Sequence, residues 1–143
     1  MRPIRLYWFA AGLLLLSGCS DAGPQRASVS GTVLVDGQPF EEGTINFFPV
    51  GDTQGPSAGA VIEKGEYQIE RQKGVVVGQN RVEIQGNRKT GRKIPDPMGS
   101  GALVDELVEA LPPECNSKST LSRTVTSGHN TINFDQQGTR TGK

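Results

Sequence analysis

Residues 28–50, SVSGTVLVDGQPFEEGTINFFPV, hold two runs in which apolar and polar residues alternate. Alternation places every second side chain on the same face of an extended chain. The apolar residues that share a face are Val29, Val33 and Val35 in the first run and Ile45 and Phe47 in the second. Asp-Gly-Gln-Pro at residues 36–39 separates the runs and is typical of a turn. The stretch therefore predicts two short strands, each with one buried face.

Five further runs have the composition and length of strands. They occupy residues 57–63, 66–70, 74–85, 120–126 and 131–135. Lys64-Gly65 and the segment 127–130 separate neighbouring runs and are typical of hairpin turns. Seven short strands with frequent turns predict an all-β fold, either an antiparallel sandwich or an open barrel. The residues expected in its core are Ile45, Phe47, Tyr67, Val82, Ile84, Val125, Ile132 and Phe134.

Residues 102–111, ALVDELVEAL, have a different pattern. The apolar residues that recur at helical spacing are Leu103, Val104, Leu107, Val108 and Leu111, with acidic residues on the opposite side. Ser100 can cap the start of a helix, and Pro112 prevents its continuation. This pattern predicts one short amphipathic helix between the fifth and sixth strands, covering one end of the core.

The N-terminus has the features of an exported, lipid-anchored protein. Arg2 and Arg5 precede an apolar run at residues 6–16, which is shorter than the roughly 20 apolar residues that span a membrane. The tetrapeptide LSGC at residues 16–19 resembles the lipobox of bacterial lipoproteins, in which cleavage before the Cys frees that residue for acylation. The resemblance implies lipidation, by palmitate or a similar chain, at Cys19. An ordinary secretory signal that ends near a Cys is the alternative.

This organisation divides the chain into a signal peptide, a lipidated tether, one domain and a flexible tail, at residues 1–18, 19–27, 28–136 and 137–143. An Asp directly after the lipidated Cys would resemble an inner-membrane retention signal. Ser20 occupies that position in this chain. We therefore expect a cell-envelope protein anchored in the outer rather than the inner membrane.

Charge and histidine content argue against several classes of function. The chain has 15 Lys+Arg and 15 Asp+Glu, giving a formal net charge of +0, whereas nucleic-acid binders have a basic excess. His129 is the single histidine and lies among turn residues, which disfavours both a His-rich metal site and a serine triad. We therefore predict no catalytic residue, no metal and no cofactor, and expect that the chain is not an enzyme.

Four motifs follow one another along the chain. They are VSGTVLVDGQPFEEGTINFFP at 29–49, KGEYQI at 64–69, LPPECNSKSTL at 111–121 and GHNTINF at 128–134. Together they resemble the carboxypeptidase regulatory-like, or transthyretin-like, domain carried by small bacterial lipoproteins of uncharacterised function. The resemblance spans residues 28–136 and implies a seven-stranded antiparallel Greek-key sandwich without a catalytic centre.

Two residues depart from the pattern of that family. Cys115 stands where relatives have an aromatic residue, and with Cys19 assigned to lipid it has no disulfide partner. We expect a buried structural thiol, the alternative being an exposed, reactive or dimer-forming one. Arg123 lies between Leu121 and Val125, where relatives alternate apolar residues. We expect its side chain to reach water at the sheet margin, the alternative being a binding role.

Two sets of residues are candidates for contact with a partner. The basic run Arg88, Lys89, Arg92 and Lys93 either meets phosphate head groups or an anionic surface polymer, or forms a solvated loop or hairpin tip. Alternation leaves Phe48 facing outward beside Phe40 in the preceding turn. This pair either forms a contact patch or packs beneath the predicted helix.

Two classes of function remain after these considerations. The first is a non-catalytic, membrane-anchored interaction module that contacts an envelope protein or a surface polymer. The second is a carrier of small ligands. The first is favoured because the domain has few aromatic residues to line a pocket and its short tether holds it at the membrane.

Overall fold

A computed structural model describes residues 23–139, so the signal sequence and Cys19 lie outside the described residues. The strands are β1 (Arg26–Val35), β2 (Gln38–Pro39), β3 (Glu42–Pro49), β4 (Ala58–Glu63), β5 (Glu66–Ile69), β6 (Val75–Val76), β7 (Gly78–Gln85), β8 (Asn87–Pro95), β9 (Leu103–Glu109), β10 (Ser122–Val125), β11 (His129–Thr131) and β12 (Phe134–Gln136). Two short 3₁₀ turns are η1 (Arg71–Lys73) and η2 (Pro113–Cys115). Within residues 23–139, no helix has the length and apolar character needed to cross a membrane.

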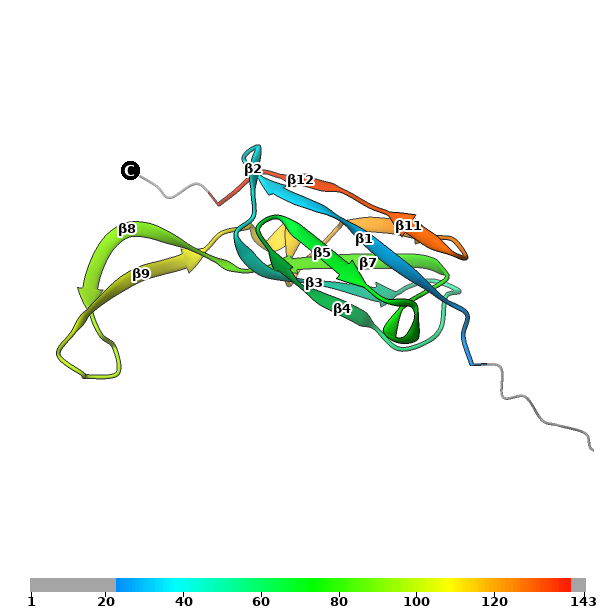
Figure 1. Cartoon of the computed structure of the whole chain (residues 1–143), viewed down its shortest axis with the longest axis horizontal. Coiled ribbons are helices and arrows are strands. Elements are labelled where there is room, and N and C mark those ends of the chain that lie inside the picture. The colour runs from blue at the N-terminus through cyan, green and yellow to red at the C-terminus, as the bar shows by residue number, and fades with distance from the viewer. Residues whose placement is uncertain (1–22, 140–143) are drawn as a thin grey trace, which may run out of the picture.

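The main sheet has the order β10-β7-β3-β4-β5-β1-β11, a path of seven strands (Figure 1). Neighbours along it are antiparallel, except that β1 pairs in parallel with β11 and also with β12. Strands β3, β4 and β5 are consecutive neighbours and β1 lies beside β5, which is a Greek-key arrangement. The all-β, sandwich-like antiparallel fold predicted from the sequence is therefore confirmed.

The sheet curls until β10 comes close to β12. Cζ of Arg123 lies 4.9 Å from the centroid of the Phe134 ring, and its Nη1 donates to the Ser122 carbonyl at 2.8 Å. Arg123 is half-buried, and its side chain covers the edge of the core. This agrees with the position expected for it at the sheet margin.

Alternation predicted the core well. Seven of the eight expected residues are buried, and Ile132 is partly buried against them. The Phe47 and Tyr67 rings lie 6.3 Å apart, and the Tyr67 hydroxyl donates to the Ile132 carbonyl at 2.8 Å. Burial raises the pKa of Tyr67. The predicted Lys64-Gly65 turn has positive φ at both residues, 51° and 80°, as a type I′ hairpin turn requires.

The predicted helix at residues 102–111 is wrong, because residues Leu103–Glu109 form strand β9, paired antiparallel with β8. Residues four positions apart lie on the same face of a helix. Because side chains alternate along a strand and four is even, such residues also lie on the same face of a strand. Leu103 and Leu107 thus share one face of β9, and Val104 and Val108 share the other. Pairing with β8 decides between the two structures.

The predicted hairpin between the runs at 120–126 and 131–135 is also wrong. Strand β10 pairs with β7 and strand β11 pairs with β1, at opposite ends of the sheet path. The Asn130 side chain binds both backbone groups of Thr126, accepting from its N–H at 3.0 Å and donating to its carbonyl at 2.8 Å. These bonds hold a crossing between the two sides of the sandwich rather than a hairpin turn.

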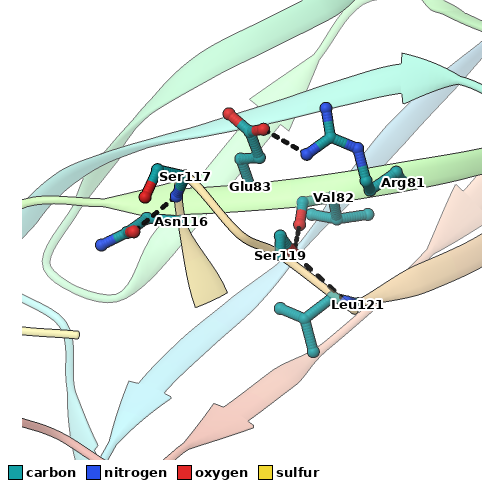
Figure 2. Close-up of polar contacts among 7 residues, drawn as sticks. All are labelled: Arg81, Val82, Glu83, Asn116, Ser117, Ser119 and Leu121. Carbon is teal, nitrogen blue, oxygen red and sulfur yellow. Dashed lines mark hydrogen bonds and ion pairs between the residues drawn. The ribbon is translucent and has the colours of Figure 1, made fainter. Parts of the chain in front are cut away.

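Hydrogen bonds join the segment between β9 and β10 to strand β7. Figure 2 shows the Ser119 hydroxyl donating to the Val82 carbonyl and accepting from the Leu121 N–H at 3.2 Å. Arg81 and Glu83 form an ion pair on the same strand. The hydrogen bonds of Ser119 therefore fix the path by which the chain returns from β9 to the main sheet.

Cys115 is 5% exposed within this segment, and its thiol donates to Oε1 of Gln136 at 3.3 Å. Burial raises the pKa of the thiol, which keeps it protonated and unreactive at neutral pH. The prediction of a buried structural thiol is confirmed.

Candidate functional site

Strands β8 and β9 form a separate two-stranded sheet, the arm, which extends away from the curled main sheet (Figure 1). The pairing runs from Asn87 opposite Glu109 at the root to Pro95 opposite Leu103 near the tip. Gly91, with φ of 84°, lies where the register shifts between Lys89 and Lys93. The basic run that the sequence suggested as a loop or hairpin tip therefore lies within a strand.

The basic run is matched by acidic residues of the opposite strand. Nζ of Lys89 and of Lys93 lie 2.8 and 2.6 Å from the two carboxylate oxygens of Asp105. Arg92 binds both oxygens of Glu106, with Nε and Nη2 at 2.8 and 2.6 Å. Hydrogen bonds from Lys89 and then Lys93 lower the pKa of Asp105 to about 2. These three cations stabilise the arm, which weakens their case as a free anion-binding patch.

Arg88 has a different role at the root of the arm. Its Nη2 donates to the Thr139 carbonyl at 2.6 Å, and the Thr139 N–H donates to the Ala110 carbonyl at 2.8 Å. The Gly138 N–H donates to the Asp36 carboxylate at 2.9 Å. Residues at the start of the expected tail thus join the arm root to the main sheet, and Arg88 takes part in this junction.

The arm also exposes large apolar side chains. Leu103 is 66% and Leu107 55% exposed, and Met98 at the tip is 94% exposed. An isolated two-stranded hairpin is at best marginally stable in water. Exposed apolar residues gathered on one element are typical of contact surfaces.

A groove of about 1120 Å³ lies between the arm and the main sheet. Its wall on the arm side includes Lys89 and Leu107, and its wall on the sheet side includes Val61 and Glu42. Val61 is 56% exposed and also lines a shallow depression over β1, β4 and β5. The groove therefore continues onto the outer face of the main sheet.

Three glutamates stand next to one another on that outer face. Glu42 pairs with Glu63 across β3 and β4, and Glu63 pairs with Glu66 across β4 and β5. We call these three residues the glutamate stripe. Among residues 23–139 no lysine or arginine forms an ion pair with any of them. Like charges directly opposite on neighbouring strands are destabilising, so a cationic partner would relieve the repulsion.

The two phenylalanines proposed as a contact patch do not form one. Phe40 is 5% exposed and belongs to the core cluster. Phe48 lies on the outer face of β3, half-buried, with Cζ of Arg81 5.0 Å from its ring centroid. The segment expected to cover the pair as a helix forms strand β9, and of the two rings only Phe40 belongs to the core cluster.

The single histidine lies between two serines. Nδ1 and Nε2 of His129 lie 3.1 Å from the hydroxyls of Ser28 and Ser30 respectively. Within the part of the chain that the structure describes, no carboxylate hydrogen-bonds the ring. The arrangement therefore lacks the third group that orients the base of a hydrolase.

One further motif lies at residues 55–59, where GPSAG matches the Gly-x-Ser-x-Gly pattern of hydrolases. That pattern needs the serine on a turn from a strand into a helix. Here Ser57 is exposed and leads directly into strand β4, which does not pair with the strand of His129. The structural context for a nucleophile is missing.

No protein-family model matches this chain, and no curated protein matches it. Across the described range 23–139, no group of three His, Cys, Asp or Glu residues is arranged to hold a metal ion. The arm, the groove and the glutamate stripe are the features from which function is argued below. The opposite charges at residues 89–93 and 105–106 were the signal in the sequence that could have indicated the pairing of β8 with β9.

Proposed function

We propose that the chain is a non-catalytic, membrane-anchored interaction module of the cell envelope, and that the arm is its contact element. The observation that carries this proposal is the pair of exposed leucines, Leu103 and Leu107, on a two-stranded sheet that projects from the domain. The partner class is a protein, because exposed leucines are buried by apolar protein surface and not by a charged polymer.

The arm is suited to recognition because it is already formed. Asp105 and Glu106 hold cations from the opposite strand, and Arg88 holds the root. An element with ordered strand pairing loses less conformational freedom on binding than an unstructured loop does, so more of the contact energy appears as affinity. Exposed strand edges on both sides of the arm add unpaired backbone groups that a partner can use.

The anchoring part of the proposal rests on the sequence. The lipobox-like residues 16–19 and the resemblance to carboxypeptidase regulatory-like lipoproteins support an envelope protein, with the outer membrane favoured. Strand β1 starts at the end of the domain opposite the arm (Figure 1). A domain tethered through the residues before β1 would therefore present its arm away from the membrane.

Replacing Cys19 with Ala should prevent lipidation of the chain. We expect uncleaved precursor to accumulate and labelling with radioactive palmitate to disappear, because the acyl acceptor is gone. The Cys115→Ala variant is the control and should be labelled normally. Labelling that persists in Cys19→Ala would contradict the anchor.

The contact role of the arm is tested with a photo-crosslinking residue placed at position 103 of the full-length, lipidated protein in cells. We expect a discrete crosslinked protein band, lost when Leu107→Asp is added, because the charge disrupts the same apolar face. The crosslinker at Asp52, an exposed site in the loop after β3, is the matched control. No band from position 103, together with a small molecule bound to the purified protein in native mass spectrometry, would favour a ligand carrier instead.

A further inference from the structure

One face of the arm combines apolar and cationic side chains. The β8–β9 register places Leu107 opposite Lys89, Lys93 opposite Asp105 and Pro95 opposite Leu103, all on the same face. Side chains of Lys89 and Lys93 are 70% and 57% exposed, although both contact Asp105. The face therefore presents two leucines and two accessible ammonium groups that share the Asp105 carboxylate, with exposed Glu109 at the root of the arm.

The outer face of the main sheet is complementary to this surface. Val61 is exposed there, and the glutamate stripe at Glu42, Glu63 and Glu66 lies beside it. An apolar centre with an anionic border matches an arm face with leucines and lysines. Contact between the two would cover exposed apolar area and place cations against carboxylates that have no cationic partner among residues 23–139.

Both surfaces belong to one chain and open onto the same groove, which Leu107 and Lys89 line from the arm and Val61 and Glu42 line from the sheet. Surfaces on the same side of a protomer can be exchanged around a two-fold axis, which closes the assembly at two copies. Complementary surfaces on opposite sides would instead generate an open chain.

Edge-to-edge pairing of arms is a less favourable way to associate. Strand β9 carries Asp105, Glu106 and Glu109, and β8 carries four cations, so either strand would meet like charges on its own symmetry mate. Like charges across a strand pair are destabilising. Face-to-face packing avoids this repulsion.

The available area is at the lower limit for a dimer. The 7 residues of β9 make an arm about 24 Å long and about 10 Å wide. Two arms, each covering an equal patch on the other copy, would bury about 1,000 Å² in all, the least expected of a specific interface.

We infer that the partner of the arm is a second copy of this chain, with each arm lying across Val61 and the glutamate stripe of the other copy. This inference rests on the proposed role of the arm as a contact element and identifies the protein that the arm contacts.

The first test uses two differently tagged full-length copies expressed together, one with Val61→Cys and the other with Leu103→Cys. We expect a disulfide-linked heterodimer on non-reducing gels, which an arm folded back on its own domain cannot give. Asp52→Cys replaces Val61→Cys in the control and should give no heterodimer. Absence of the Val61–Leu103 heterodimer would overturn the inference.

The second test measures self-association of the lipidated protein in detergent by analytical ultracentrifugation. Lys93→Glu and Glu63→Lys should each weaken the dimer about tenfold, because each places like charges at both symmetry-related contacts. The double variant should recover most of the loss. A monomer at all concentrations, with position 103 crosslinking to a different protein, would refute the second copy but keep the proposed function. If position 103 crosslinks to nothing, both fail.

Discussion

Replacing Phe47 with Ala should lower the free energy of unfolding by about 3–5 kcal/mol. Phe47 is 0% exposed, belongs to the central strand β3 and packs against the Tyr67 ring at 6.3 Å. Removing the ring leaves a cavity that neighbouring strands cannot close without breaking their ladders, so the loss combines burial and packing. Urea denaturation followed by circular dichroism measures it.

Phe48 provides the matched control, since it is the same residue type on the next position of the same strand. It is half-buried on the outer face beneath Arg81. We expect Phe48→Ala to cost less than about 2 kcal/mol, mainly through lost packing and a surface cation–π contact. Equal losses for the two variants would show that the faces of β3 are assigned incorrectly.

The core could be predicted because it depends on a local rule. Within each of β3, β5 and β7, alternation decides which side chains are buried, and neighbouring strands in register complete the same layer. Alternation does not predict the burial of Phe40, because this residue lies between β2 and β3 and outside any strand. Its burial follows from how the turn folds back over the core.

The arm could not be predicted from β9 alone. The spacing of Leu103 and Leu107 fits two secondary structures equally well, and the deciding contacts come from β8. Asp105 and Glu106 find their cations in the opposite strand rather than along a helix. In the sequence the cations form a run of their own and the carboxylates fit the polar side of a helix, so no local pattern pairs them.

The order of β10 and β11 was unpredictable for a similar reason. Residues 127–130 resemble a hairpin turn, but a turn specifies only a local reversal and does not name the neighbouring strand. Asn130 binds Thr126 while β11 pairs with β1, so the polypeptide crosses the sandwich. Long-range pairing with β1 therefore overrides the local preference.

That C-terminal pairing supplies the second large prediction: Gly31→Ala should destabilise the domain by about 3 kcal/mol, as overpacking against backbone does at its upper range. A Cβ at Gly31 would lie 1.9 Å from the Ile132 carbonyl oxygen and 2.7 Å from its carbon. The close approach is set by the bond from the Ile132 N–H to the Ser30 carbonyl at 2.9 Å. Backbone cannot yield as a flexible side chain would, so the C-terminal segment must move away from β1.

The displacement should have a local signature as well as a global one. The Ile132 carbonyl accepts the Tyr67 hydroxyl, and moving it would leave a buried donor without its acceptor. We therefore expect lost hydrogen-exchange protection at the Ile132 amide, in addition to a lower denaturation midpoint. Gly23→Ala is the control, because a Cβ there meets nothing within 4 Å, and should change stability by less than about 0.5 kcal/mol. If Gly31→Ala is as stable as Gly23→Ala, the C-terminal strand does not lie against β1 as described.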